Sequence, residues 1–211
     1  MKKLLVVLAL VAAAGVLAFA QRRRRVAPEV HLVPAADLDR ARAFYGERLG
    51  LRAAPVDGWP EAGEVALSCL SGQYLVLRKA AAPRTFKDTG VHQAYRAGPA
   101  SIERIVQSLA ADSIAVHRYH EDRPAEQNDA CYFADPDGNR IQLVRKETTI
   151  GPGVVGIDHT AVLASDMEWE EDFYKDCLGL PVEHRVGVNP ADYVRARLWG
   201  EGKEEMAPDT R

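Results

Sequence analysis

The stretch DLDRARAFYGERLGL, residues 37–51, recurs as DMEWEEDFYKDCLGL at residues 166–180. In each copy an Asp is placed to cap a helix, apolar side chains return at helical spacing, and a Gly is placed to end the helix. A unit that returns at a fixed offset indicates one supersecondary module used more than once. The two copies align without a gap at an offset of 129, and the identical pairs are Asp37 and Asp166, Phe44 and Phe173, Tyr45 and Tyr174, Leu49 and Leu178, Gly50 and Gly179, and Leu51 and Leu180.

The segments around the first copy indicate a β-α-β-β order. An apolar strand, VHLVP at 30–34, precedes the helix, and Ser71-Gly72 is a hairpin signal between EVALSCL at 64–70 and QYLVLRK at 73–79. We expect a further short strand in the loop around Trp59. The order then returns, with a strand at 91–96, a helix at 99–111, and strands at 114–118, 129–133 and 140–145.

These elements divide the chain into parts. Residues 26–146 hold two complete units, and residues 147–154 are typical of a linker because they contain a Gly-Pro-Gly breaker. Residues 155–211 begin a third unit that carries the second copy of the repeat. The predicted fold class is α+β.

The stretch FADPDGNRIQLV, residues 133–144, predicts two strands joined by a tight turn. In the turn Asp135-Pro136-Asp137-Gly138, Pro presets φ and Gly accepts a positive φ. In the strand that follows, Ile141 and Leu143 share one face and Gln142 points to the other. Gln142 is therefore a polar side chain on the face opposite the core, where we expect it to contact a ligand.

The N-terminal 25 residues form a separate segment, in which MKK precedes 17 apolar residues at 4–20 and QRRRR follows. A basic start, an apolar centre and the Ala18-Phe19-Ala20 pattern are typical of a signal peptide that is cleaved for export. Seventeen apolar residues are also just long enough for a membrane anchor, and the arginines would then place the remaining chain on the cytoplasmic side. We favour the anchor and keep export after cleavage near Ala20 as the alternative.

Composition excludes some classes of function. The hydrophobic share is 47%, which is enough for a core and argues against a disordered chain. The net charge is −3 although the first 25 residues carry basic groups and no acidic one, so the remainder is acidic and nucleic acid is not an expected partner. The cysteines form no C-x-x-C pair, and we expect Cys69, Cys131 and Cys177 to be buried small side chains rather than a disulfide framework or a zinc site.

The two motifs together resemble the βαβββ modules of the vicinal oxygen chelate superfamily, which includes glyoxalase I, bleomycin-resistance proteins and extradiol catechol dioxygenases. The resemblance covers residues 29 to about 198. The layout of two modules, a linker and a third module that opens with GIDHTAV is most similar to the extradiol dioxygenases. It implies paired modules whose sheets form a cup, with an Fe²⁺ or Mn²⁺ site in the second of two cups.

The resemblance also implies where metal ligands would lie. The site would need two His and one carboxylate, from the first and last strands of a module. The first-strand position is seven residues before the capping Asp, which gives His159 in the third unit and Val30 in the first. In the second unit the corresponding positions are His92 and Gln142. The first cup would thus present Val30, His92 and Gln142 to a ligand, and His159 would be the metal ligand of a second cup.

Three functions follow from the resemblance. The first is ring cleavage of a catecholic aromatic by a His/His/Glu metal site. This chain shows one of those ligands and no fourth module before Arg211. We therefore expect it to be inactive and assign no catalytic residue. The second is a metal-free protein that binds a small molecule in the first cup. The third is a glyoxalase-like lyase or isomerase, which Val30 and Gln142 disfavour. An incomplete third unit would expose apolar surface, so we expect self-association.

Overall fold

The computed structural model describes residues 30–54, 63–82, 91–118, 130–147, 151–162 and 164–182. The apolar segment at 4–20 and Trp59 lie outside these ranges. Among the helices of the described ranges, none combines the length and the apolar character needed to cross a membrane.

The first unit forms a four-stranded sheet with one helix. Its order along the chain is β1 (Val30–Ala35), α2 (Leu38–Ala43), a π-helical turn η1 (Phe44–Arg48), β2 (Arg52–Ala53), β3 (Glu64–Ser68) and β4 (Tyr74–Lys79). In space the strand order is β1-β4-β3-β2, with β1 parallel to β4. The predicted strands and helix are confirmed within a few residues. A short strand, β2, directly follows the repeat, and the strand expected around Trp59 falls outside the described residues.

The second unit repeats this order in a five-stranded sheet. It contains β5 (His92–Ala97), α3 (Pro99–Ala111), β6 (His117–Arg118), β7 (Ala130–Ala134) and β8 (Arg140–Arg145), with β5 parallel to β8. The fifth strand is β9 (Val154–Ala161), which belongs to the third unit and pairs antiparallel with β5. The order across the sheet is β6-β7-β8-β5-β9. Two β-α-β-β-β units in mixed α+β architecture confirm the predicted fold class.

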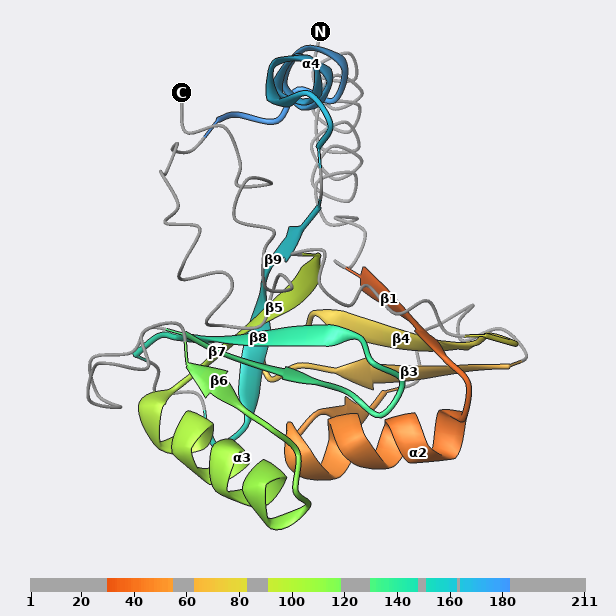
Figure 1. Cartoon of the computed structure of the whole chain (residues 1–211), viewed down its shortest axis with the longest axis vertical. Helices are drawn as coiled ribbons and strands as arrows, with labels where there is room; N and C mark the ends of the chain where they lie inside the picture. The colour runs from red at the N-terminus through yellow and green to blue at the C-terminus, as the bar shows by residue number, and fades with distance from the viewer. Residues whose placement is uncertain are drawn as a thin grey trace, which may run out of the picture.

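One core joins the two sheets. Helices α2 and α3 lie on the same side of the sheets, below them in Figure 1. Strand alternation sends one set of side chains towards these helices, and packing them together buries a continuous apolar cluster. Its largest fully buried side chains include Tyr45, Leu49, Tyr95, Ile105, Phe133 and Ile141.

Two of the three cysteines are buried as predicted, namely Cys69 and Cys131. Burial raises the pKa of the Cys131 thiol to about 12. Cys177 is exposed, so the prediction of burial was wrong for this cysteine.

The predicted turn of the second unit is anchored on the first unit. Gly138 has a φ of +87°, as the turn requires. The carboxylate of Asp135 accepts hydrogen bonds from the backbone N–H groups of Asp137 and Asn139, and from the Tyr45 hydroxyl at 2.9 Å. The Asp137 carboxylate pairs with Arg40 on α2 at 2.8 Å. The DPDG turn therefore connects the two modules through polar contacts at the edge of their shared core.

The third unit begins with a close backbone contact to the first. The carbonyl oxygen of Leu49 accepts a hydrogen bond from the N–H of Val154 at 2.9 Å, where β9 starts. Gly153, just before it, has a φ of +114°, and a Cβ at this position would lie 3.3 Å from the Leu49 oxygen. Glycine is required here both by the backbone conformation and by the space available.

Gly153→Ala is accordingly expected to lower the free energy of unfolding by about 1–3 kcal/mol. Gly72→Ala is the matched control, since Gly72 has a φ of +86° but no atom within 4 Å of an added Cβ. Urea unfolding of both variants separates the two causes. If the two losses are equal, conformational strain alone explains the effect and the contact with Leu49 contributes nothing.

The helix of the third unit copies that of the first but buries nothing. Helix α4 (Met167–Asp172) runs into a π-helical turn η3 (Phe173–Cys177), as α2 runs into η1. The carboxylate of Asp166 accepts from the N–H groups of Glu168 and Trp169, and Asp37 caps α2 in the same way through Arg40. None of the residues of α4 and η3 is buried, and α4 lies at the far end of β9, away from α2 and α3 (Figure 1).

Candidate functional site

A row of paired residues crosses one face of the five-stranded sheet. Tyr132 on β7 pairs with Gln142 on β8, Gln142 pairs with Ala94 on β5, and Ala94 pairs with His159 on β9. Residues that pair across strands point to the same face, and so does His92, which is two residues from Ala94 on β5. The face opposite the helices therefore carries His92, His159, Gln142 and Tyr132 on neighbouring strands.

A β-bulge at Asp158 turns His159 to this face. Simple alternation would put Ile157 and His159 on the same side of β9. The register shifts between Ala94 and Tyr95, because Ala94 pairs with His159 while Tyr95 pairs with Ile157, which leaves Asp158 as the extra residue. Ile157 consequently enters the core and His159 points to the opposite face, which is the local effect expected of a bulge.

The two imidazoles meet on this face. The Nε2 atoms of His92 and His159 are 3.3 Å apart, and the ring centroids are 5.4 Å apart in an edge-to-face arrangement. His92 is buried, with the ring of Tyr132 packed edge-on against it at 5.5 Å. The His159 side chain is 45% exposed. The His92 ring is thus packed against Tyr132, and the His159 ring is the part of the pair that solvent reaches.

The other nitrogen of His159 is held by its neighbour in the chain. The Nδ1 atom of His159 lies 2.8 Å from an Asp158 carboxylate oxygen. An ionised carboxylate can only accept, so Nδ1–H donates to it. In the neutral imidazole the Nε2 atom then carries the lone pair and points at His92.

Gln142 contributes an oxygen to the same face. Its side chain is buried, and its Oε1 atom has no hydrogen-bond donor within the described ranges. A buried amide oxygen without a donor is uncommon, because leaving it unpaired costs about 1–3 kcal/mol. It is therefore a candidate for contact with a bound ion or ligand.

These residues were tested for their fit to a divalent metal. Two nitrogens at about 2.1 Å from one ion, with a bond angle of about 90–100°, lie about 3.0–3.2 Å apart. The 3.3 Å between the Nε2 atoms of His92 and His159 fits two ligands in adjacent coordination positions. No group of three or more His, Cys, Asp or Glu side chains suited to a metal occurs in the described part of the chain. The Gln142 amide oxygen, on the same face of the sheet, is a candidate third donor.

The structure brings together residues that the sequence analysis had separated. His159 was assigned to a second cup and His92 to a first cup, but the pairing of β9 with β5 puts their imidazoles side by side. Val30, expected to share the cup with His92, lies on β1, whose hydrogen-bonded neighbour is β4. Strands β1 and β9 contact each other through side chains, because Oγ1 of Thr160 on β9 lies 3.1 Å from Nε2 of His31 on β1. Strand β9 thus lies beside β5, and β1 belongs to the other sheet.

Three contributors were missed at the sequence level. Tyr132 could have been found from the alternation of Cys131 and Phe133 around it on β7. Asp158 precedes the predicted ligand directly, and a carboxylate next to a His is a signal for a partner of the second ring nitrogen. Arg96, whose Nε atom lies 3.8 Å from Asp158 Oδ2, left no signal in the sequence.

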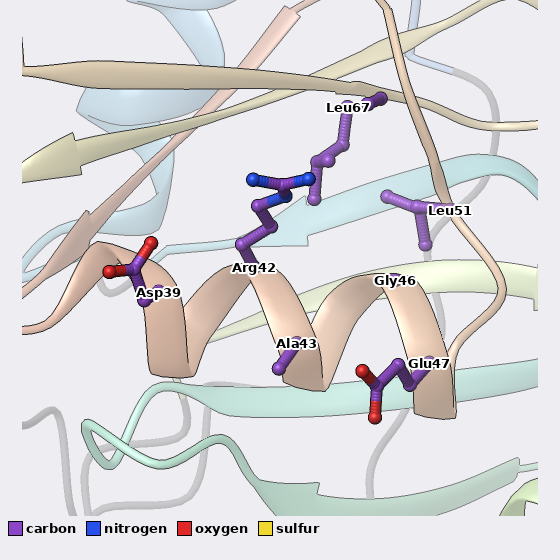
Figure 2. A pocket seen from close by; sticks show the side chains of 8 residues that line it. Asp39, Arg42, Ala43, Gly46, Glu47, Leu51 and Leu67 are labelled. Atoms are coloured by element: carbon purple, nitrogen blue, oxygen red, sulfur yellow. The ribbon is translucent and has the colours of Figure 1, made fainter.

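A separate pocket of about 390 Å³ lies beside α2. Asp39, Arg42 and Glu47 line it from the helix, and Figure 2 shows Arg42 pointing towards Leu67 on β3. It shares no lining residue with the imidazole pair, and its own charged groups are a mixture of both signs. We therefore place the candidate site at the imidazole pair.

Comparison with known proteins was informative at the level of structure. No family model and no curated protein sequence matches the chain. Among solved structures, a "putative dioxygenase" from Bacillus subtilis superposes with a TM-score of 0.58 and 16% identity, over 76% of this chain and 57% of the other. The chain shares the fold of that structure, in agreement with the paired βαβββ modules that the resemblance implied.

This chain spans 57% of the length of that structure. Two other solved structures with vicinal oxygen chelate folds align with lower scores. A glyoxalase/dioxygenase from Nostoc punctiforme has a TM-score of 0.47 and 21% identity, over 59% of this chain and 92% of the other. The fosfomycin resistance protein FosX from Listeria monocytogenes has a TM-score of 0.45 and 14% identity, over 58% and 92%. A shared fold does not define a reaction, which has to be argued from the site.

Proposed function

We propose that the chain is a metal-dependent enzyme that binds Fe²⁺ or Mn²⁺ between His92 and His159 and opens the ring of a catecholic aromatic with O₂. The observation that carries the proposal is the 3.3 Å between the two Nε2 atoms on one sheet face. The predicted inactivity rested on the absence of both a second imidazole and a Glu beside His159. His92 on the neighbouring strand would supply the imidazole, and Gln142 would take the place of the carboxylate.

Each residue would have a defined role. His92 and His159 would bind the ion, and the Gln142 amide oxygen would take a third position. The ring of Tyr132 fixes the orientation of the His92 ring from the sheet side. The exposed side of His159 leaves room for a ligand to approach. A divalent ion bound there would hold two neighbouring oxygen atoms of a catechol and bring O₂ next to them.

The choice of ring cleavage among the chemistries of this fold has two supports. The order of modules in the sequence is most similar to that of the extradiol dioxygenases. The solved structure with a TM-score of 0.58 carries the name of a dioxygenase.

A metal-free binding protein for a small aromatic molecule is the second candidate, and the neutral side chain of Gln142 favours it. A site with two imidazoles and an amide has no anionic ligand, and Fe²⁺ or Mn²⁺ sites commonly contain a carboxylate. In this case His92, Gln142 and Tyr132 would contact the ligand directly.

Metal binding can be measured by titrating Mn²⁺ into the full chain in a calorimeter. We expect one site per chain, and His92→Ala or His159→Ala should each weaken binding by more than about 100-fold, since a direct ligand outweighs the 10–100-fold effect of an outer partner. His117→Ala is the control, because His117 lies on the same sheet but on β6, three strands from β5. Unchanged affinity in both His variants would contradict the metal site.

The reaction is tested with the chain loaded with Fe²⁺ without air and then mixed with a catechol and O₂. Oxygen uptake together with a ring-opened product supports ring cleavage. Metal binding without uptake of oxygen would overturn the proposed reaction. Catechol binding that persists unchanged in EDTA would favour the metal-free binding protein instead.

A further inference from the structure

We infer that Asp158 is a positioning residue for the metal site, and that it supplies from outside the ligand set the negative charge that Gln142 does not supply within it. The inference rests on the proposed function, because it concerns the same site. Two independent features point to Asp158: it is the bulge residue of β9, and its carboxylate contacts the outer nitrogen of His159.

Asp158 is held between two groups. One carboxylate oxygen lies 2.8 Å from His159 Nδ1, and the other lies 3.8 Å from Arg96 Nε on β5. Arg96 also donates from Nη2 to the carbonyl oxygen of Ile157 at 2.7 Å, across the bulge. Arg96 therefore holds the backbone of the bulge by a hydrogen bond. It lies near the Asp158 carboxylate at the distance of an ion pair and without a hydrogen bond from Nε to it, and the carboxylate in turn orients the His159 ring.

This orientation decides which nitrogen can bind an ion. With Nδ1–H donating to Asp158, the lone pair of His159 is on Nε2, the atom that faces His92. Without the carboxylate, the neutral ring could place its proton on either nitrogen and could rotate about the side chain. Asp158 thus keeps His159 in the tautomer and direction that a shared ion needs.

The charges of the candidate ligands support the inference that Asp158 supplies a negative charge to the site. Two neutral imidazoles and one amide carry no net charge, so the two positive charges of a divalent ion would not be offset. A His/His/carboxylate set would offset one of them. Asp158 adds one negative charge through His159. Arg96 opposes it only in part, because its side chain is 42% exposed and solvent screens the pair.

The experiment measures Mn²⁺ affinity of the full chain by calorimetry for four variants. Asp158→Asn removes the charge but keeps an oxygen that can accept from Nδ1–H, and we expect about a 10-fold loss. Asp158→Ala removes charge and acceptor, and the loss should approach about 100-fold. Gln142→Glu should strengthen binding, and adding it to Asp158→Asn should restore at least the affinity of the unmodified chain.

Asp112→Asn is the matched control, because it removes a carboxylate paired with Arg48 at 2.6 Å that lies outside β9. A second readout needs no metal: ¹⁵N NMR of the histidines should show His159 with an unprotonated Nε2 in the unmodified chain and a mixture of tautomers in Asp158→Ala. Because an unfolded chain would also give a mixture of tautomers, the circular dichroism spectrum of each variant is recorded to show that it is folded.

The outcomes separate the two proposals. If Asp158→Asn and Asp158→Ala bind Mn²⁺ like the unmodified chain while His92→Ala does not bind, the role of Asp158 is overturned and the metal site stands. If Gln142→Glu fails to rescue Asp158→Asn although Asp158→Ala loses affinity, Asp158 orients the ring and the charge argument is wrong. If the unmodified chain binds no Mn²⁺, the metal site and this inference both fail.

Discussion

Leu49→Ala is expected to lower the free energy of unfolding by about 2–5 kcal/mol, whereas Leu178→Ala should change it by less than about 0.5 kcal/mol. The two leucines occupy the same position of the repeat and follow the same π-helical turn. Leu49 is 0% exposed in the core, so truncation removes apolar contacts and leaves a cavity. Leu178 is 54% exposed, and its truncation leaves no cavity to collapse.

Urea unfolding of both variants, followed by circular dichroism, tests this comparison. Because both leucines follow a π-helical turn and have similar backbone dihedral angles, each variant is the control for the other, and the effect of the Leu→Ala change on local backbone propensity cancels. A loss at Leu178 as large as that at Leu49 would contradict the exposure of α4 and η3 and would show that their apolar face is packed in solution.

The two copies also show what sequence could predict. Local structure followed from local residues in both: Asp37 and Asp166 cap their helices, and Gly50 and Gly179 have φ values of +77° and +68°. Burial did not follow, because it depends on the sheet that a helix meets and not on the helix itself. The same apolar pattern is buried in the first unit and exposed in the third.

Strand pairing was the second limit. The positions of His92 and His159 on first strands were assigned from the resemblance, but nothing in the sequence of either strand specifies the strand with which it pairs. Strands β1 and β9 begin equivalent units, and β9 is the one that pairs with β5. Hydrogen bonds between strands are made by backbone groups, which β1 and β9 both have. Which of them pairs with β5 therefore depends on the packing of the whole chain.

The bulge at Asp158 was a third limit. Sequence alternation assigns each strand residue to a face only while the pairing stays regular. A single extra residue changes the face of every residue beyond it. Gly156 inside the strand is a sign of a nearby irregularity, but the sequence does not show which residue is the extra one. The tight turn at Asp135 was predictable because its residue types each have a backbone reason to be there.

Asp135→Ala is the second change expected to have a large effect, with a loss of about 3 kcal/mol or more in the free energy of unfolding. The Asp135 carboxylate accepts from the N–H groups of Asp137 and Asn139, from the Asn139 side-chain amide and from the Tyr45 hydroxyl. All four donors lose their acceptor when it is removed, and the Tyr45 hydroxyl is fully buried. Tyr45→Phe removes only one of these bonds and should cost about 1 kcal/mol.

The effect should also depend on pH. Burial raises the pKa of the Asp135 carboxyl above its usual 3.8, and the hydrogen bonds from Asn139 and Tyr45 oppose this only in part. The folded chain then holds the proton more tightly than the unfolded chain. The stability linked to this proton is fully present below the unfolded pKa and is lost as the pH rises through the folded pKa.

The cost of Asp135→Ala should accordingly be larger near about pH 4 than near about pH 7, because the unmodified chain loses its proton-linked stability over that interval and the variant has none to lose. Urea midpoints of both chains at the two pH values measure the difference. Asp39→Asn is the control for general effects of charge, since Asp39 is an exposed carboxylate on α2. A cost that instead grows with pH would mean that the hydrogen bonds to the carboxylate outweigh its burial, and that the DPDG turn holds an anion in preference to a neutral acid.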